Sequence, residues 1–304
     1  MANKLQRVLA RLPTYWTYMR ERPSWVLVLL GGRVLFVRQV ERQLRRAAPR
    51  SVPPTLSSRL HVDAPDRIVP ELERDGVSPR LTLSASDVAA IRAFAEQTPC
   101  TTRAAPIRSF LAGDIDAVNA ERPRDVIAAY FFDRIHECPT IAKIEADPLI
   151  RAIAEGYIGG TPHHIRTRLW WSFPGKRVAE ADLHAAAQDK YHFDLNDFRT
   201  VKFFFYLTDV DRMSGPHAYI AGSHHKRKIR HQYTLMVGHD EAELRAYYGD
   251  DRFHVLTGPA GTGFAEDPFI FHVGMTCKER PRLLLEIEFG PAIASKSYRY
   301  GEIG

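Results

Sequence analysis

The second half of the 304-residue chain contains six short runs of β-branched and aromatic residues, each bounded by glycine, proline or aspartate. Runs of this length and composition predict β-strands, and several in close succession predict a sandwich or a barrel. The runs lie at 165–173, 200–208, 217–221, 252–256, 269–273 and 282–289. A single helical segment, at about 240–248, is predicted to interrupt them.

The first half has a different pattern, in which helical signals dominate. Ser86 and Asp87 can cap a helix that runs to about Gln97, and further periodic stretches occupy 122–136 and 140–157. The proline-rich stretch 49–83 is predicted to be an irregular connector. Helices followed by many short strands predict an α+β protein.

Charge is distributed unevenly along the chain. The sequence has 42 Lys and Arg against 36 Asp and Glu, a net charge of +6, and its pI is about 9.2. Residues 1–50 hold eleven basic and two acidic side chains, a net charge of +9, which leaves 31 basic and 34 acidic side chains, or −3, for the remainder. Because the basic charge is confined to one end, no nucleic-acid partner is predicted for the protein.

The basic N-terminal part, residues 1–60, is predicted to be a helical extension of a main domain at 61–304. Segments 3–22 and 34–46 have the pattern of amphipathic helices. One hypothesis is that this extension packs on the main domain with its arginines in solvent. The alternative is that residues 1–50 attach the protein to an anionic membrane surface or another anionic partner.

The sequence favours a cytoplasmic location. The longest apolar stretch, 25–37, is interrupted by Gly31, Gly32 and Arg33 and is shorter than the ~20 residues of a membrane-spanning helix. It also begins too late for a signal peptide. The three cysteines lie far apart and form no C-x-x-C pair, which argues against a disulfide scaffold or a cysteine zinc site. No oligomeric state is predicted.

The segment 191–225 contains the most informative arrangement of chemical groups. In an extended strand, residues i and i+2 point to the same face, so His192 and Asp194 can direct an imidazole and a carboxylate toward one point. One more imidazole would complete the two-histidine, one-carboxylate triad that holds non-haem Fe(II). The pair is weak evidence alone, because His61 and Asp63 have the same spacing. That second pair lies in the proline-rich stretch and is predicted to be a surface feature.

The surroundings of His192 and Asp194 resemble the phytanoyl-CoA dioxygenase family of Fe(II)/2-oxoglutarate oxygenases. The resemblance is carried by VKFFFYLTDVD at 201–211, by Gly-Pro at 215–216, by Gly-Ser-His at 222–224 and by FIFHVGMTCKERPRLLLEIEFG at 269–290. It covers roughly residues 160–290, with a weaker echo at 71–77. It implies a double-stranded β-helix core, of the jelly-roll or cupin type, with N-terminal and flanking helices.

The resemblance also implies roles for individual residues. His192, Asp194 and His272 correspond to the iron ligands, and Arg282 opens the last core strand, where the family binds the far carboxylate of 2-oxoglutarate. Arginine suits that task because its planar fork can donate two parallel hydrogen bonds to one carboxylate. Arg280 is the nearby competitor, but its position in a loop predicts exposure.

Two further residues are candidates for binding the co-substrate. Phe204 corresponds to a position where some family members have an aromatic residue beside 2-oxoglutarate, although aromatic strand residues usually belong to the core. Arg168 shares a strand face with Arg166 and Trp170 and could contact 2-oxoglutarate or an anionic substrate. The basic run at 224–231 is predicted to be a solvated surface that could meet an anionic group.

The sequence therefore predicts a dioxygenase that uses Fe(II), 2-oxoglutarate and O2 to hydroxylate a small molecule, such as a secondary metabolite, a lipid or an acyl derivative, with release of succinate and CO2. In related halogenating enzymes a small residue replaces the carboxylate ligand, so Asp194 favours hydroxylation or another oxidation. Two alternatives remain: a jelly-roll metalloenzyme that does not use 2-oxoglutarate, and a non-catalytic binding protein at a membrane surface. Arg282 argues against the first alternative, because an enzyme that does not use 2-oxoglutarate does not need it. The complete set of His192, Asp194, His272 and Arg282 argues against the second.

Overall fold

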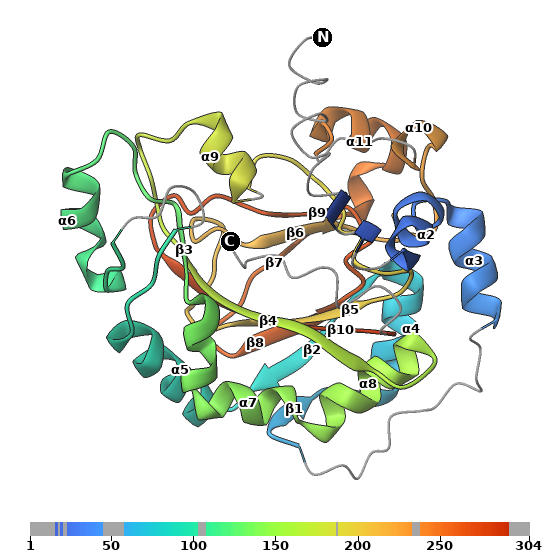
Figure 1. The fold of residues 1–304 in the computed structure, drawn as a ribbon, viewed down its shortest axis with the longest axis horizontal. Coiled ribbons are helices and arrows are strands. Elements are labelled where there is room, and N and C mark those ends of the chain that lie inside the picture. The colour runs from blue at the N-terminus through green and yellow to red at the C-terminus, as the bar shows by residue number, and fades with distance from the viewer. Residues whose placement is uncertain are drawn as a thin grey trace.

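Two antiparallel β-sheets lie one above the other in the computed structural model of the chain, and helices surround them (Figure 1). The structure describes residues 16, 17, 19, 20, 23–44, 58–102, 108–186, 188–232 and 238–291. The α+β class predicted from the sequence is confirmed. The helix predicted at 3–22 falls largely outside the described residues.

The larger sheet has seven strands and the smaller sheet has three. The larger sheet contains β1 (Leu60–Val62), β2 (Val77–Leu83), β3 (Ala128–Tyr130), β4 (His163–Ser172), β5 (Val201–Tyr206), β8 (Thr262–Glu266) and β10 (Arg282–Gly290). The smaller sheet contains β6 (His217–Ile220), β7 (Phe253–Leu256) and β9 (His272–Gly274). The strand orders are β1-β2-β8-β5-β10-β4-β3 and β7-β6-β9, and each of these pairings is antiparallel.

Seven of the ten α-helices of the described chain precede β4, and seven of the ten strands start at or after it, although β1, β2 and β3 lie among the helices. The α-helices are α2 (Ser24–Gly31), α3 (Leu35–Leu44), α4 (Pro65–Asp75), α5 (Ala85–Gln97), α6 (Ile115–Ala120), α7 (Pro139–Glu145), α8 (Pro148–Ile158), α9 (Glu180–Ala185), α10 (Ile229–Gln232) and α11 (Glu241–Tyr248). Short 3₁₀ turns are η1 (Ala112–Asp114), η2 (Phe132–Glu137) and η3 (Asp250–Arg252). The stretch predicted to be helical at 140–157 forms α7 and α8, and Asp147 caps α8, because its side chain accepts a hydrogen bond from the backbone N–H of Leu149.

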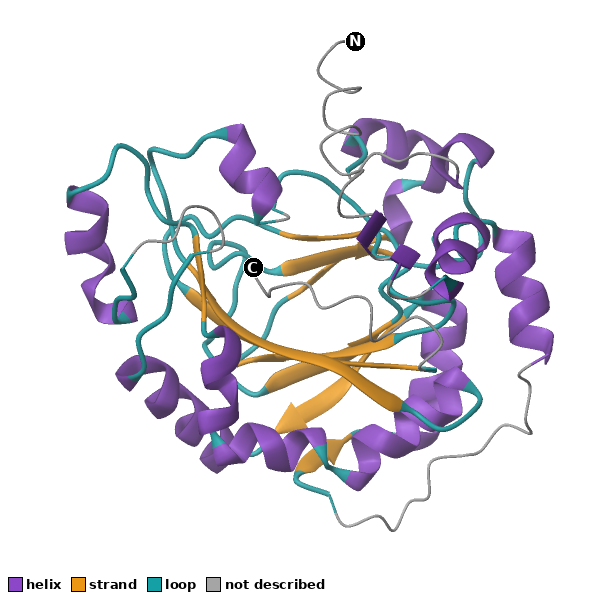
Figure 2. Cartoon of the chain, viewed as in Figure 1, coloured by secondary structure: helices purple, strands orange, loops and turns teal. Residues whose placement is uncertain are grey.

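Alternation along β10 creates two different environments on the two faces of the larger sheet. Its even-numbered and odd-numbered residues point to opposite faces. The odd-numbered set packs in the main hydrophobic core with α4, α5, α7 and α8: Leu283, Leu285, Ile287 and Phe289. The even-numbered set faces the space between the sheets: Arg282, Leu284, Glu286 and Glu288. Figure 2 shows the helices gathered along the outer side of this sheet.

The predicted connector at 49–83 is wrong, because its second part forms β1, α4 and β2. Pro65 and Pro79 occupy positions where a missing N–H does little harm, whereas Pro70 lies inside α4. Pro65 begins α4, where the first N–H groups have no partner within the helix. Pro79 lies where the pairing of β2 with β8 shifts register, between Ser78 and Leu81.

Two other predicted elements also differ from the structure. The helix predicted at 122–136 is wrong, because Ala128–Tyr130 pairs with β4 as an edge strand and a 3₁₀ turn follows. Pairing between distant segments has overridden the local periodicity there. The strand predicted at 269–273 begins only at His272, and β8 was not predicted.

Candidate metal centre

A backbone bridge holds two of the predicted metal ligands side by side. His192 and His272 form an isolated antiparallel bridge, in which the N–H of each donates to the carbonyl of the other at 2.9 and 2.8 Å. Residues directly opposite each other in such a bridge project their side chains to the same face, and the two ring centroids are 4.6 Å apart. Asp194, two residues further on, returns to that face, and its N–H donates to the carbonyl of Pro268 at 2.8 Å.

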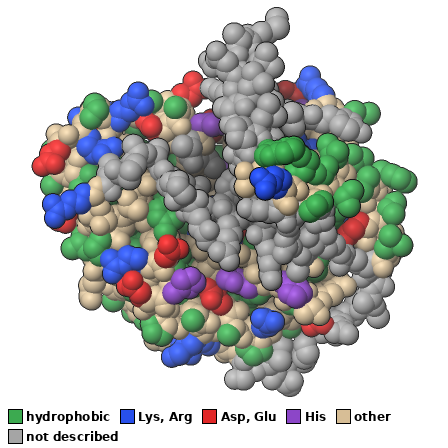
Figure 3. Space-filling model, in the orientation of Figure 1, with side chains coloured by type: hydrophobic (Ala, Val, Ile, Leu, Met, Phe, Trp, Pro, Cys, Tyr) green, Lys and Arg blue, Asp and Glu red, His purple; other side chains and the backbone are tan. Residues whose placement is uncertain are grey.

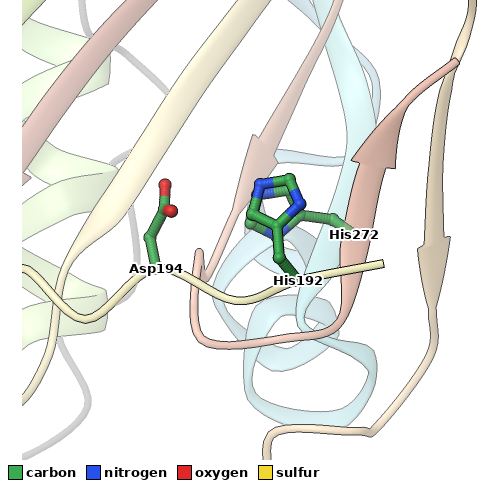
Figure 4. A group of neighbouring side chains, drawn as sticks. All are labelled: His192, Asp194 and His272. Carbon is green, nitrogen blue, oxygen red and sulfur yellow. The ribbon is translucent and has the colours of Figure 1, made fainter. Parts of the chain in front are cut away.

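The structure thus brings His192, Asp194 and His272 together (Figure 4). One ligand atom from each lies within 4.8 Å of those from the other two. Within the part of the chain that the structure describes, no other group of three or more His, Cys, Asp or Glu side chains has this arrangement. Two imidazole nitrogens and one carboxylate oxygen are the donor set that suits non-haem Fe(II).

The backbone fixes which nitrogen of each ring can bind a metal. Nδ1 of His192 is 3.1 Å from the carbonyl oxygen of Lys190, and Nδ1 of His272 is 3.1 Å from that of Ile270. A carbonyl oxygen only accepts, so Nδ1 must donate, and the neutral ring then has its lone pair on Nε2. Burial lowers the pKa of His272 to about 4, so this ring is neutral at physiological pH. Both rings are therefore prepared to bind a metal through Nε2.

Lys202 holds the carboxylate of the cluster. Its side chain is 1% exposed, and its Nζ forms an ion pair with Oδ2 of Asp194. Burial would raise the pKa of Asp194, but the nearby Lys202, His272 and His192 outweigh it and hold that pKa well below its ordinary value. Asp194 is consequently ionised, with Oδ1 outside the contact to Lys202.

A network of buried charges continues from Lys202 across the inner face of the larger sheet. Glu286 on β10 pairs with Arg168 on β4, is 3.4 Å from Arg166 Nε and is 3.7 Å from Lys202 Nζ. Burial alone would raise the pKa of Glu286, but these cations lower it to about 2. Arg166 also reaches Glu288 at 2.9 Å. Buried charges need partners, and these side chains supply them for one another.

Arg282 lies at the opposite end of β10 from Glu288 and is 2% exposed. Its guanidinium donates to the carbonyl of Gly215 and, at 3.2 Å, to Oγ of Ser172, while its buried Nε has no hydrogen-bond partner. A Cβ built on Gly274, at the end of the strand that His272 begins, would lie 3.6 Å from Nη2 of Arg282. Arg280, in contrast, is exposed and pairs with Asp211, as its loop position predicted.

The two secondary candidates also face the space between the sheets. Arg168 uses its fork on Glu286, with Nε 2.9 Å from Oε1, and its guanidinium lies over the ring of Trp170. Phe204 is 4% exposed and packs against Phe264 and His217, with ring centroids at 5.0 and 5.3 Å. Their predicted contact with 2-oxoglutarate stays a prediction.

The sequence analysis missed a buried acid–imidazole pair beside the cluster. Nε2 of His217 is 2.6 Å from Oε2 of Glu266, and Oε1 of Glu266 is 3.6 Å from Nδ1 of His272. Burial lowers the pKa of His217 to about 3 and raises that of Glu266 to about 7, so the shared proton resides on Glu266 below neutral pH.

The sequence analysis also did not single out the buried charged residues Lys202, Glu286 and Glu288, although the sequence contained a signal for them. The two-residue period that places Arg282 on the inner face also places Glu286 and Glu288 there, and the period of β5 groups Lys202 with Phe204. Charged residues at inward positions of an otherwise apolar strand are rare, and they mark a site or a buried ion pair. His217 and Glu266 gave a weaker signal, because β8 itself was not recognised.

The other predicted surface features gave mixed outcomes. His61 and Asp63 are exposed as predicted, and Asp63 pairs with Arg80, although His61 lies on a short strand. The run 224–231 is not wholly solvated, because three of its side chains are buried. Those three are His224, Arg227 and His231. The guanidinium of Arg227 lies among the rings of Phe193, Phe269 and Phe271, which replace water around it.

Comparison with known proteins agrees with this geometry. The family model described as Phytanoyl-CoA dioxygenase (PhyH) matches residues 73–274, about two thirds of the chain, and this range includes His192, Asp194 and His272. Arg282 lies eight residues beyond it. No curated protein matches the chain.

Solved structures are similar in fold. HygX from Streptomyces hygroscopicus, with nickel and 2-oxoglutarate bound, has a TM-score of 0.50 and 14% identity, and covers 74% of this chain and 87% of that one. EctD from S. alaskensis with bound Fe has a TM-score of 0.48 and 20% identity, covering 81% and 85%. The epimerase SnoN with Fe3+, alpha ketoglutarate and nogalamycin RO has a TM-score of 0.49 and 16% identity, covering 74% and 83%. The predicted jelly-roll core is confirmed.

Proposed function

The chain belongs to the phytanoyl-CoA dioxygenase family, and from that premise we propose that it is a non-haem Fe(II)/2-oxoglutarate-dependent dioxygenase acting on a small molecule. The observation that carries the proposal is the convergence of His192, Asp194 and His272, with one ligand atom of each within 4.8 Å of the others. The reaction we propose is hydroxylation, with release of succinate and CO2.

The three side chains would hold Fe(II), which with 2-oxoglutarate and O2 supplies the oxidising chemistry when bound. The work of the chain itself is positioning. The carbonyls of Lys190 and Ile270 accept from Nδ1 of the two histidines and so leave Nε2 of each ring for the metal, and Lys202 fixes one oxygen of Asp194. Such outer contacts orient ligands and preserve their basicity.

Arg282 would bind the distal carboxylate of 2-oxoglutarate. It is the buried guanidinium of the inner face that pairs with no carboxylate in the described residues, and its Nε has no hydrogen-bond partner there. Ser172, already in contact with Arg282, would supply a hydroxyl beside the same carboxylate. Phe204 would form an apolar wall. Arg168 donates to Glu286 from Nε and Nη2, so only its remaining N–H groups would be available to an anionic group of 2-oxoglutarate or the substrate.

The substrate we propose is a small molecule bound between the sheets, and Asp194 favours oxidation over halogenation at the metal. A cytoplasmic location is proposed from cysteine usage, since all three cysteines are buried and free. The competing function is that of a jelly-roll metalloenzyme without 2-oxoglutarate.

The test is anaerobic addition of Fe(II) and then 2-oxoglutarate to the metal-free protein, followed by visible spectroscopy. A weak charge-transfer band that requires both additions is expected. Normal binding of Fe(II) without such a band would exclude the use of 2-oxoglutarate and favour the competing function. A mass-spectrometric screen for products that gain one oxygen together with succinate would then identify the substrate.

A further inference from the structure

Helix α3 is packed on the protein with its charged side facing inward. Arg38 lies over the ring of Phe269, 3.7 Å from the centroid, and reaches Asp267 at 3.9 Å, while Arg42 pairs with Glu73. Amphipathic helices of water-soluble proteins normally turn their apolar side inward and their charges outward. The expectation that the arginines of 34–46 face solvent is therefore wrong for both of these residues.

The outward side of α3 is consequently apolar. Phe36, Val40 and Leu44 recur at intervals of four residues and are 71%, 42% and 83% exposed. The other exposed residues of this helix are Gln39 and Gln43, so its exposed side carries no charge.

The neighbouring helix α2 extends this apolar surface. It exposes Leu27 by 65% and Leu30 by 66%, one helical turn apart. Figure 3 shows hydrophobic side chains gathered where Figure 1 places α2 and α3. Of nine exposed large hydrophobic residues found in the described chain, seven lie between positions 16 and 44. Apolar surface concentrated in this way marks an interaction site.

A basic segment borders the apolar surface. Gln232 of α10 accepts a hydrogen bond from the backbone N–H of Leu35 at 3.0 Å, which places α10 beside the start of α3. Ile229, at the start of α10, is 73% exposed and stands between Lys228 and Arg230 in the chain. Apolar and cationic side chains therefore occur together at this edge.

Charge selects the occupant of this surface. Apart from Arg38 and Arg42, which pair inward with Asp267 and Glu73, residues 1–50 carry nine basic and two acidic side chains. A second copy of the chain would bring the same positive charge against itself, whereas an anionic lipid surface would complement it. We propose that the outward face of α2 and α3, with Ile229, docks the protein on the surface of an anionic membrane.

The docking is interfacial. Among the described residues, no helix is both long enough and apolar enough to cross a bilayer. A helix with an apolar side and nearby cations instead lies in the plane of the headgroups, held by apolar insertion and by attraction to anionic lipids.

Deleting the extension would be a poor test, because α2 also packs against the main domain. Val28 is fully buried in a cluster with Leu195 and Phe269. Point variants on the outward side avoid this difficulty. The variant Phe36→Gln/Val40→Gln/Leu44→Gln makes that side resemble the two glutamines already there, and Leu111→Gln changes an exposed hydrophobic residue elsewhere as the matched control.

The experiment is co-sedimentation of the full chain with vesicles of phosphatidylcholine alone, or containing about one-third phosphatidylserine. We expect wild type and Leu111→Gln to bind only the anionic vesicles, and the triple variant to bind them at least about tenfold more weakly. The melting temperature and the Fe(II)/2-oxoglutarate band of the triple variant should match those of wild type.

Unchanged vesicle binding by the triple variant overturns the proposal, as does equal binding of wild type to both kinds of vesicle. A wild-type protein that ignores vesicles but forms a dimer, which the triple variant loses, also overturns it and identifies a second copy as the occupant. The variant Lys228→Gln tests the basic edge: weaker binding to anionic vesicles, by about twofold to fivefold, supports the proposal.

Discussion

The two faces of the larger sheet are built from the same strands but have opposite physical character. Along β10, Leu285 and its outward neighbours pack against helices in an apolar core, whereas Glu286 and its inward neighbours belong to a network of charges. Both faces are fully buried. The outer face stabilises the fold by removing apolar surface from water, and the inner face places ionised groups around a candidate metal centre at the cost of their hydration.

This difference teaches that burial alone does not separate structural from functional residues in this fold. Leu284 and Leu285 are adjacent, identical in type and both at most 2% exposed. Only the direction in which each side chain points assigns it to a cluster, since Leu284 packs between the sheets and Leu285 packs under the helices.

The largest effect is expected for Asp194→Ala, which removes the only carboxylate of the triad. We expect succinate release with Fe(II), 2-oxoglutarate and O2 to fall by about a thousandfold or more, because the metal loses a ligand. Asp63→Ala is the matched control, since Asp63 has the same His-x-Asp spacing but is exposed. Similar activities in the two variants would remove Asp194 from the site.

The next largest effect is expected from two alanine variants that compare the two faces of β10 directly. Leu285→Ala and Leu284→Ala should each lower the free energy of unfolding by about 2–5 kcal/mol, because each leaves a cavity. Only Leu284→Ala should also change the apparent affinity for 2-oxoglutarate or substrate. Urea unfolding and titration of the charge-transfer band measure the two quantities. Equal changes of affinity in both variants would contradict the division between the faces.

The pH dependence of stability tests the buried pair on the inner face. The pKa of Glu266 is raised from 4.5 to about 7, so its folded form holds a proton more tightly than the unfolded chain. Its contribution to stability is therefore complete below pH 4.5 and is lost as the pH rises through about 7. The contribution is at most about 3 kcal/mol.

Glu266→Gln should abolish this contribution in the metal-free protein. Between pH 5 and pH 8, the unfolding free energy of the variant should improve relative to wild type as the pH rises. Glu96→Gln, on an exposed side chain of α5, is the control. Urea unfolding at several pH values makes the comparison, and parallel profiles for wild type and Glu266→Gln would refute the raised pKa.

The smallest effect concerns the two arginines near the start of β10. Arg282→Lys keeps the charge but loses the planar fork, so the KM for 2-oxoglutarate should rise by about tenfold. Arg280→Lys, in the exposed loop, should change it less than about twofold. Equal effects on KM would show that the co-substrate binds elsewhere.

Much of the site could be predicted because it depends on short-range spacing. His192 and Asp194 are two positions apart, which places both on one strand face, and the aromatic strand that follows is a strong β signal. His272 could be identified only through the family resemblance, because the bridge that pairs it with His192 joins segments 80 residues apart. Backbone pairing over such a distance leaves no local pattern.

The rest of the fold could not be read for similar reasons. β8 escaped prediction since Gly263 makes it look like a turn, yet glycine is needed there because a Cβ would collide with the ring of Phe205. The prediction of which side of α3 faces the solvent was also wrong. The sequence pattern of this helix shows that its two sides differ in polarity, but it does not show which side packs on the protein. The charged side packs inward because carboxylates of the main domain, such as the buried Asp267, pair with its arginines.

The packing of helix α2 bears on which truncated forms of the chain would keep an intact surface beside Asp194. Val28 lies against Leu195, the residue after Asp194, and a Cβ on Gly31 would be in van der Waals contact with the ring of Phe198. The region that the family shares starts only at residue 73. A protein reduced to that region would therefore lose the apolar contact of Val28 with Leu195, next to the candidate ligand Asp194. The packing of α2 against the segment that follows Asp194 is thus made by residues outside the range that the family model matches.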